Sequence, residues 1–144
     1  MIRKATKADY PAAAALAVKM WEDADPRELT REWEAADAAG EGAVLIAEEG
    51  GTIVGFAQCA LRHDYEEGTR SSPVGYLEGV YVEEAFRRRG YAAQLLAACE
   101  AWAKEKGCRE FASDCELTNT DSLNFHLAMG FLEANRIICF TKKC

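Results

Sequence analysis

The sequence predicts an α/β fold, in which a mixed and mostly antiparallel sheet carries helices on both faces. Apolar residues recur at helical or strand spacing in the order βααβββαβαβ. The pair Gly50-Gly51 between two apolar runs indicates an antiparallel hairpin. A strand, a helix and a further strand in succession near the C-terminus indicate one parallel pair. Together these observations favour a sheet with both kinds of pairing, covered on each face.

The first half of the chain is expected to hold a short strand, two helices and the hairpin. Residues 2–5 form the strand, and Thr6 begins an alanine-rich helix that extends to about residue 23. Pro26 suits the first turn of a second helix, which ends near Gly40 because glycine favours the left-handed cap. The two hairpin strands are expected at residues 43–48 and 52–61.

The second half alternates strands with helices. A turn-rich stretch, residues 64–73, precedes a strand over residues 74–82. One apolar face of a long helix begins at Ala92 and ends before Gly107, which suits a helix C-cap. The remaining expected elements are a strand at 109–114, a helix at 118–129 stopped by Gly130, and a last strand at 136–141.

The composition is that of one folded domain spanning residues 1–144. The apolar share of the chain is 49%, enough for a packed core at this length. No apolar run approaches the roughly 20 residues needed to cross a bilayer, and no basic-then-apolar leader begins the chain. We therefore expect a cytoplasmic protein that does not insert into membranes. The six cysteines form no Cys-x-x-Cys pair, which favours free, mostly buried thiols over a metal site or a disulfide scaffold.

The charge of the chain bears on its partners. The net charge is −7, which disfavours binding to nucleic acid or to anionic lipid and favours cations. Against this acidic background, Arg87, Arg88 and Arg89 follow one another directly. Three consecutive cations indicate a place where an anion binds.

The segment around these arginines has the features of a pyrophosphate site. It connects the strand over residues 74–82 to the long helix, whose first N–H groups have no partner within the helix. Gly90 and Ala92 are small enough to let an anion approach those groups. The spacing alone is equally compatible with a basic turn that only starts a helix. Neither the dinucleotide fingerprint nor the nucleotide P-loop is present, which directs the interpretation toward coenzyme A.

These residues resemble the signature of the GCN5-related N-acetyltransferase (GNAT) superfamily. That signature is Arg/Gln-x-x-Gly-x-Gly/Ala between a strand and a helix, and Arg87, Gly90 and Ala92 match it. The element order and the ending Asn119…Gly130-Phe131 match as well, so the resemblance covers essentially the whole chain. It implies a GNAT-like fold and acetyl-coenzyme A as co-substrate, with no metal.

Longer stretches resemble the aminoglycoside 6′-N-acetyltransferases of that superfamily. They are residues 68–69 with 72–82, 102–104, 110–114 and 140–143. The resemblance implies transfer of an acetyl group to a primary amine of a cationic small molecule, the 6′-amine of an aminoglycoside, by direct attack in a ternary complex. It also implies a homodimer.

The resemblance further implies which residues contact each substrate. The coenzyme would be bound by Val80, Tyr81, Val82, Arg87, Arg88, Arg89, Gly90, Tyr91, Ala92, Ala93 and Asn119. The acceptor would be bound by Trp21, Tyr65, Glu78 and Asp114. Carboxylates and aromatic faces are the groups that hold ammonium ions, so these residue types suit a cationic acceptor.

Glu78 is the expected general base, because a protonated amine must lose a proton before it attacks. It shares a strand face with Tyr76 and Val80, which suits a lined cleft better than a solvated edge. Asp114 fits a substrate contact and, nearly as well, a plain loop cap. Trp21 also fits a core position, since it follows Ala17 at helical spacing.

His126 is the expected proton donor to the departing thiolate. Many superfamily members carry a tyrosine four residues before the final Gly-Phe, and His126 holds that place here. A helix-face histidine packed beside Phe125 and Met129 fits the pattern equally well. Asn135 stands where related antibiotic enzymes can carry an acid.

Two alternatives to this function stay open on the sequence alone. The same chemistry on a polyamine or a protein N-terminus would also suit an acidic cleft. A non-catalytic module that binds acyl-coenzyme A would carry the same arginine turn without turnover.

Overall fold

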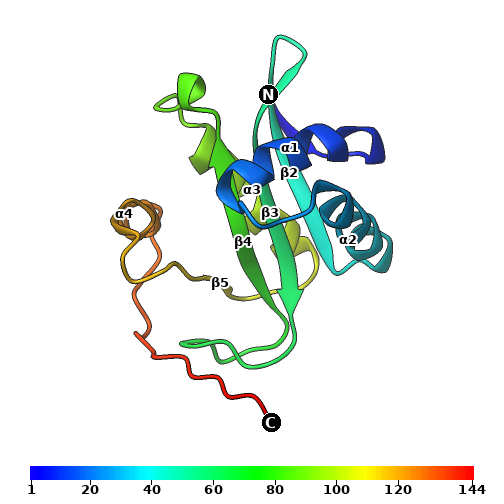
Figure 1. Cartoon of the computed structure of the whole chain (residues 1–144). Coiled ribbons are helices and arrows are strands. Elements are labelled where there is room, and N and C mark those ends of the chain that lie inside the picture. Colours follow the sequence, from blue (N-terminus) through cyan, green and yellow to red (C-terminus); the bar gives the residue numbers. More distant parts are fainter.

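The computed structural model describes residues 1–144 and contains one five-stranded sheet in the order β1-β2-β3-β4-β5. Its strands are β1 (Ile2–Lys4), β2 (Gly42–Glu49), β3 (Thr52–Arg62), β4 (Val74–Val82) and β5 (Phe111–Ser113). The first four strands pair antiparallel in succession, whereas β5 runs parallel to β4. The mixed sheet predicted from the sequence is therefore confirmed (Figure 1).

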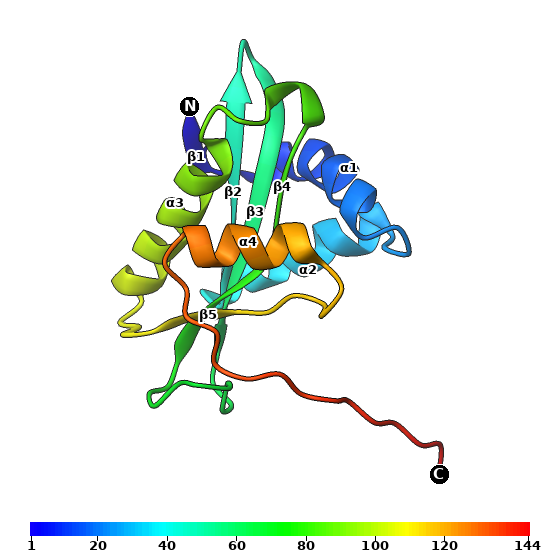
Figure 2. The same cartoon turned by 90° about the vertical axis from the view of Figure 1, so that its left-hand side faces the viewer.

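Helices cover both faces of this sheet, as expected. The helices are α1 (Tyr10–Met20), α2 (Pro26–Ala39), α3 (Tyr91–Glu105) and α4 (Thr120–Ala128), with short 3-10 turns at Lys7–Asp9 and Glu84–Phe86. Helices α1 and α2 lie on one face and α3 lies on the other, while α4 lies beside β4 and β5 (Figure 2). No helix of the structure combines the length and the hydropathy that a membrane span requires.

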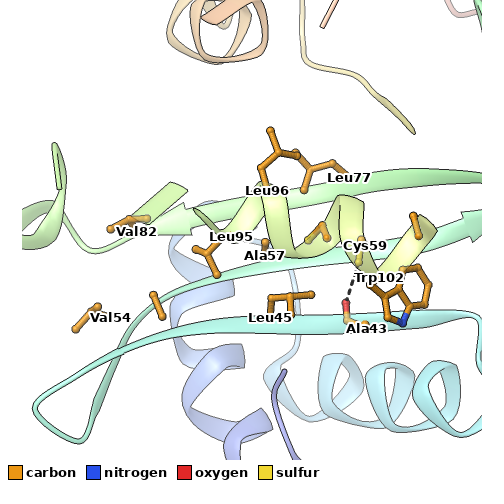
Figure 3. Packing of buried hydrophobic residues seen from close by; sticks show 13 residues of the cluster. Ala43, Leu45, Val54, Ala57, Cys59, Leu77, Val82, Leu95, Leu96 and Trp102 are labelled. Carbon is orange, nitrogen blue, oxygen red and sulfur yellow. Dashed lines mark hydrogen bonds between the residues drawn. The ribbon is translucent and has the colours of Figure 1, made fainter. Parts of the chain in front are cut away.

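Two buried clusters fill the space on either side of the sheet. Strand β2 contributes to both, because successive side chains point to opposite faces. Val44 and Ile46 pack with α1 and α2, whereas Leu45 and Ala47 pack with α3. On the α3 side, Leu95, Leu96, Cys99 and Trp102 cover β2 to β4 (Figure 3). The helical spacing read from the sequence thus gave the correct buried face of α3.

One hairpin turn and both ends of α2 lie at the glycines and the proline from which they were predicted. Gly50 and Gly51 have φ values of 59° and 80°, which suit a two-residue hairpin turn between β2 and β3. Gly40 ends α2 in the left-handed conformation, with φ 72°. Pro26 begins α2, and the Asp25 side chain accepts a hydrogen bond from the N–H of Arg27 at 3.0 Å.

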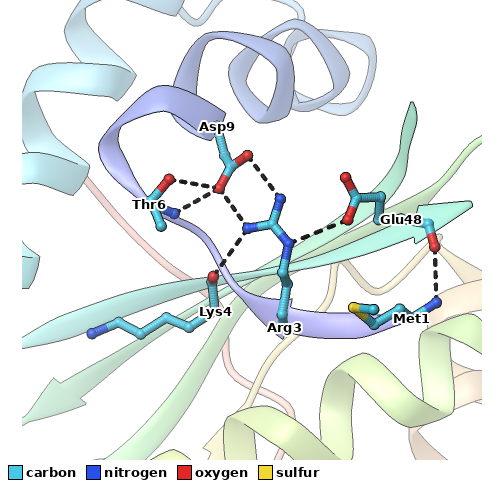
Figure 4. A network of polar contacts seen from close by, with 6 residues as sticks. All are labelled: Met1, Arg3, Lys4, Thr6, Asp9 and Glu48. Atoms are coloured by element: carbon cyan, nitrogen blue, oxygen red, sulfur yellow. Dashed lines mark hydrogen bonds and ion pairs between the residues drawn. The ribbon is translucent and has the colours of Figure 1, made fainter. Parts of the chain in front are cut away.

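The first helix begins later than Thr6, because a polar network holds a 3-10 turn there. The Asp9 carboxylate accepts hydrogen bonds from the Thr6 N–H at 2.7 Å and from both terminal nitrogens of Arg3 at 2.7 and 3.0 Å. Arg3 also donates to Glu48 on β2 at 3.3 Å (Figure 4). The bonds from Arg3, then that from Thr6, lower the pKa of Asp9 well below its usual range.

The predicted last strand at residues 136–141 is wrong. The chain from Phe131 to the C-terminus is extended without a ladder, and it projects away from the sheet (Figure 2). A strand needs a neighbouring edge, and after α4 the chain runs past the β3–β4 loop, where Asn135 donates to Glu67 at 3.3 Å. The apolar residues of this C-terminal tail (residues 131–144) are therefore exposed: Leu132 is 92% exposed and Phe140 is 91% exposed.

The cysteines agree with the sequence in one respect and differ in another. All six are free, as expected. Only Cys59 and Cys99 are buried, whereas Cys115, Cys139 and Cys144 are exposed, so the expectation of mostly buried thiols is wrong. Two of the exposed thiols lie in the C-terminal tail, whose burial was inferred from the strand that does not form.

Candidate active site

The site begins where β4 and β5 separate. Their pairing ends at Leu77 and Ser113, but β4 continues to Val82. On its other side this stretch remains paired to β3, with Val80 opposite Ala57 and Val82 opposite Gly55. The edge of β4 from residue 78 to 82 that faces β5 therefore has no neighbouring strand. An open edge of this kind presents N–H and C=O groups to an extended ligand.

Glu78 lies at a β-bulge directly at this fork. The register between β3 and β4 shifts there, since Gln58 pairs with Gly79 and Cys59 pairs with Leu77. Glu78 is the extra residue, and such bulges redirect a side chain and are common beside active sites. The bulge accounts for a half-buried carboxylate in an otherwise apolar strand.

A cradle of free N–H groups follows β4 at the start of α3. Arg88 has φ 62° and Gly90 has φ 83°, so the chain turns through two left-handed residues. The backbone N–H groups from Arg88 to Ala93 have no acceptor within the chain. Successive unpaired N–H groups in such a turn, at the positive end of a helix dipole, form an anion site. This geometry fits the diphosphate of coenzyme A.

The three arginines of this turn have different environments. The Nε of Arg87 donates to the Val82 carbonyl at 2.8 Å, which ties the cradle to the end of β4. Arg89 pairs with Glu49 at 3.0 Å, and the Tyr91 hydroxyl bonds the same carboxylate at 2.5 Å. Arg88 is exposed and has no hydrogen bond to its side chain. Only Arg89 is paired with a carboxylate, and Arg88 is the one whose whole guanidinium is free to meet a phosphate.

The acidic side of the fork contains an arginine that the sequence analysis did not single out. The Nη2 of Arg62, at the end of β3, donates to both oxygens of Glu78 at 2.6 and 2.9 Å. The same guanidinium lies 3.2 Å from Glu66 and 4.0 Å from the centre of the Tyr76 ring. Glu78 is thus a fixed anion, held by a bidentate partner that also orients it.

Asp114 contacts a second residue that the sequence did not indicate. Its carboxylate accepts a hydrogen bond from the Tyr76 hydroxyl across the β4–β5 pair. Burial, then the bond to Asp114, raises the pKa of Tyr76, so this hydroxyl stays protonated and remains a donor. Asp114 itself is exposed, and no hydrogen bond engages its second oxygen.

The two aromatic residues expected to bind the acceptor differ in burial. Trp21 is half-buried, at an edge-to-face distance of 5.9 Å from Phe56, which agrees with partial core packing. Its ring also lies against β4, where a Cβ added at Gly79 would lie 2.5 Å from Trp21 Cζ2. Tyr65 is 72% exposed in the β3–β4 loop, beside Glu66 of the Arg62 cluster. Trp21 and Arg62 therefore flank the stretch of β4 that holds Glu78 and Gly79.

His126 on α4 reaches back to β5. Its Nε2 lies 2.7 Å from Ser113 Oγ, and its Nδ1 lies 2.6 Å from the Ser122 carbonyl. Its ring packs 5.7 Å from Phe125 and 5.1 Å from Phe131, so the packing against Phe125 expected for a helix-face histidine is present. Asn119 caps the same helix, since its side chain accepts from the Ser122 N–H at 3.1 Å.

The arrangement has three parts with complementary chemistry. The open edge of β4 suits a linear chain of amides, the N–H cradle suits a diphosphate, and the carboxylates of Glu66, Glu78 and Asp114 suit a cation. No group of three or more His, Cys, Asp and Glu side chains is placed to hold a metal ion. The sequence missed Arg62, Tyr76 and Ser113 because their roles depend on pairing between separate strands and helices.

Comparison with known proteins gives a consistent result. The acetyltransferase (GNAT) family model matches residues 2–131. An aminoglycoside N(6′)-acetyltransferase type 1 of Stenotrophomonas maltophilia is 47% identical over 96% of this chain and 90% of its own length. The corresponding enzyme of Acinetobacter haemolyticus is 36% identical over 99% and 97%.

A solved structure of AAC(6′)-Iy in complex with the bisubstrate analogue CoA-S-monomethyl-acetylneamine is also similar. Its TM-score is 0.94 at 40% identity, and the match covers 100% of this chain and 98% of that one. Sequence, fold and the diphosphate cradle after β4 lead to the same assignment. The chain belongs to the acetyltransferase (GNAT) family.

Proposed function

We propose that this chain, as a single domain over residues 1–144, transfers the acetyl group of acetyl-coenzyme A to the 6′-amine of an aminoglycoside. The observation that carries this proposal is the fork between β4 and β5, with the free N–H cradle at one end and Glu78 at the other. A two-substrate reaction needs both substrates held at one point, and the fork is where the anionic and cationic sides meet.

The coenzyme is held by backbone groups more than by side chains in this proposal. Val80, Tyr81 and Val82 pair with the amides of its pantetheine arm along the open edge of β4. The N–H groups of residues 88–93 bind the diphosphate, and Arg88 adds a charge-assisted bond. Arg87 and Arg89 hold the cradle in its conformation, Arg87 by donating to the Val82 carbonyl and Arg89 by pairing with the Glu49 carboxylate. Asn119 contributes at the start of α4, where its side-chain N–H groups remain free while its oxygen caps the helix.

The acceptor is held by the acidic side of the fork. Glu78 and Asp114 bind ammonium groups, and Trp21 and Tyr65 offer flat faces for the sugar rings. Arg62 pairs with Glu78 and Glu66, so an ammonium bound by Glu78 adds to a cluster that is already fixed. The relatives named above act on aminoglycosides, and their similarity to this chain supports the choice of acceptor.

A thiol-release assay with acetyl-coenzyme A tests the substrate class. We expect turnover with an aminoglycoside that carries a 6′-amine and none with the matched compound that carries a 6′-hydroxyl. Spermidine and a short peptide with a free N-terminus complete the panel. Turnover with the polyamine or peptide alone would contradict the aminoglycoside assignment, and coenzyme binding without any thiol release would identify a non-catalytic module.

The variant Glu78→Gln tests the acidic side of the site. We expect kcat to fall about 100-fold or more, because the substitution removes the charge that orients the amine. The Kd for coenzyme A, measured by calorimetry, should not change. Glu67→Gln is the matched control, since Glu67 lies in the neighbouring loop and its side chain accepts a hydrogen bond from Asn135, outside the Arg62 cluster. An equal loss of kcat in both variants would mean that Glu78 contributes only to the overall negative charge of this surface and makes no specific contact with the amine.

We also propose that the protein forms a homodimer in the cytoplasm, where its acyl donor is made. The outer edge of β5 is unpaired, and the C-terminal tail exposes Ile137, Ile138 and Phe140. A second copy that covers these side chains would remove the largest exposed apolar surface of the C-terminal half. Sedimentation equilibrium distinguishes the dimer from a monomer.

A further inference from the structure

Ser113 and His126 form a hydrogen-bonded pair whose polarity is fixed by a third group. The Nδ1 of His126 faces the Ser122 carbonyl at 2.6 Å, and a carbonyl can only accept. A neutral imidazole therefore carries its proton on Nδ1 and presents a lone pair at Nε2. In that tautomer the Ser113 hydroxyl, 2.7 Å from Nε2, donates to this lone pair instead of to the Leu77 carbonyl, 3.3 Å away. Nε2 of His126 is then a proton acceptor.

The pair lies at the point where the sheet opens. Ser113 is the last paired residue of β5, opposite Leu77, and its Oγ lies 3.3 Å from the Leu77 carbonyl. The next residue of β4 is Glu78, and the next residue of β5 is Asp114. The half-buried Ser113 hydroxyl therefore lies at the opening of the fork, at the last paired position before the two carboxylates that the proposed function gives to the acceptor.

Both carboxylates are already engaged by other side chains. Glu78 accepts hydrogen bonds from Arg62 through both of its oxygens. Asp114 accepts from Tyr76. An imidazole is the side chain that exchanges protons near neutral pH, and here only its Nδ1 is committed to the protein backbone.

We propose that Ser113 is a catalytic residue, which accepts a proton from the acceptor ammonium while passing its own to Nε2 of His126. This inference rests on the proposed acetyl transfer. The bond from the amine nitrogen to the acetyl carbon forms and the carbon–sulfur bond breaks. Of the three ammonium protons, one stays on the amide, one reaches His126 through Ser113, and one ends on the coenzyme sulfur. The imidazolium then returns its proton to water.

The surroundings of His126 suit this temporary charge. The Ser122 carbonyl continues to accept from Nδ1–H in the protonated ring, and both ring neighbours, Phe125 and Phe131, are aromatic. The titratable groups nearest Ser113 along β4 and β5 are Glu78, which pairs with Arg62, and Tyr76 and Asp114, which are bonded to each other. His126 acts only through Ser113, and is therefore a positioning residue for the proton rather than a contact of the amine.

The test compares Ser113→Ala and His126→Gln with the wild-type chain in the thiol-release assay. We expect each variant to lose about 100-fold in kcat at pH 7, the usual scale of a lost acid–base group. The double variant should lose no more than either single one, because the two residues form one relay. The Kd for coenzyme A should stay unchanged in all three.

The pH profile separates a relay from a structural role. In the wild-type chain, log kcat should rise with pH and then level off, because the relay accepts the proton of the bound ammonium. In Ser113→Ala it should keep rising with pH, since only amine that has already lost its proton can react. Ser113→Thr, which keeps the hydroxyl, should restore the wild-type profile. Ser122→Ala is the second control, because it leaves the carbonyl that orients His126 in place.

Three outcomes would overturn the inference while leaving the proposed function intact. The first is a Ser113→Ala profile that matches the wild-type one in shape. The second is additive losses in the double variant. The third is an acetyl group on Ser113 in the intact mass after incubation with acetyl-coenzyme A, which would make Ser113 a nucleophile. Absence of thiol release by the wild-type chain would instead contradict the proposed function itself.

Discussion

At the β1 edge of the sheet the polar side chains bond to one another, whereas at the β5 edge the backbone of β4 loses its neighbour halfway along its length. Arg3, Thr6, Asp9 and Glu48 form a closed network that fastens β1 and the first turn to β2. Across the molecule, residues 78–82 of β4 and the N–H groups of residues 88–93 have free donors and acceptors. The groups left unpaired within the chain are those available to substrates.

The same difference appears in the apolar side chains. The α1–α2 face buries Phe56, Ile46 and Trp33 almost completely, at 2% exposure or less. At the other end, the C-terminal tail carries Ile137, Ile138 and Phe140, each exposed. We call β1, β2 and the α1–α2 face the closed half, and the β4–β5 fork with the C-terminal tail the open half. The buried side chains of the closed half stabilise the fold, whose whole free energy of unfolding is about 5–15 kcal/mol, whereas the exposed tail adds little to it.

The largest expected effect is a loss of stability from a substitution in the core of the closed half. Phe56→Ala removes a ring in contact with Trp21 and Trp33 and should lower the free energy of unfolding by about 3–5 kcal/mol. Phe140→Ala is the matched control in the C-terminal tail and should change the stability of the monomer by less than about 0.5 kcal/mol. Urea denaturation at low protein concentration measures both. Comparable losses would mean that the C-terminal tail belongs to the core.

The sequence predicted the closed half better than the open one. Gly50-Gly51, Pro26 and Gly40 act locally, so their turns and helix ends could be inferred from neighbouring residues alone. The segment 136–141 has the β-branched residues of a strand, but a ladder needs a free edge beside it, and that depends on where α4 ends.

In the site, the local parts were also the predictable ones. The cradle from Arg87 to Ala93 lies within one turn of chain and was located by its spacing. The partners of Glu78 and His126, namely Arg62 and Ser113, are 16 and 13 residues away in the chain. They are brought in by strand pairing and helix packing, which no spacing in a single sequence encodes.

A smaller effect is expected from substitutions at the two glycines that flank α3, only one of which lies in the N–H cradle. Gly90 and Gly107 flank α3, both with left-handed φ values, 83° and 89°. Alanine at either position should cost about 1–2 kcal/mol of stability, because the left-handed region is strained for a residue with a Cβ. Only Gly90→Ala should also weaken coenzyme A binding, since Gly90 lies in the cradle. Calorimetric titration of both variants checks this, and equal weakening would show that the loss follows helix stability rather than the anion site.

The smallest expected effect concerns the pH dependence of stability at the β1 edge, where Arg3 and Asp9 pair. The pKa of Asp9 in the folded chain lies below its unfolded value near 3.8, so the folded state binds a proton less readily than the unfolded state. The ion pair with Arg3 therefore contributes stability above about pH 4, and that contribution is lost as pH falls through the folded pKa. Asp9→Asn should lower Tm at pH 7, and its difference from the wild-type chain should shrink below pH 4. Arg3→Met should show the same convergence, because it removes the other half of the pair. A Tm difference that stays constant between pH 7 and pH 3 would mean that Asp9 acts by capping the first turn through Thr6, and that the charge of the network adds nothing to the closed edge.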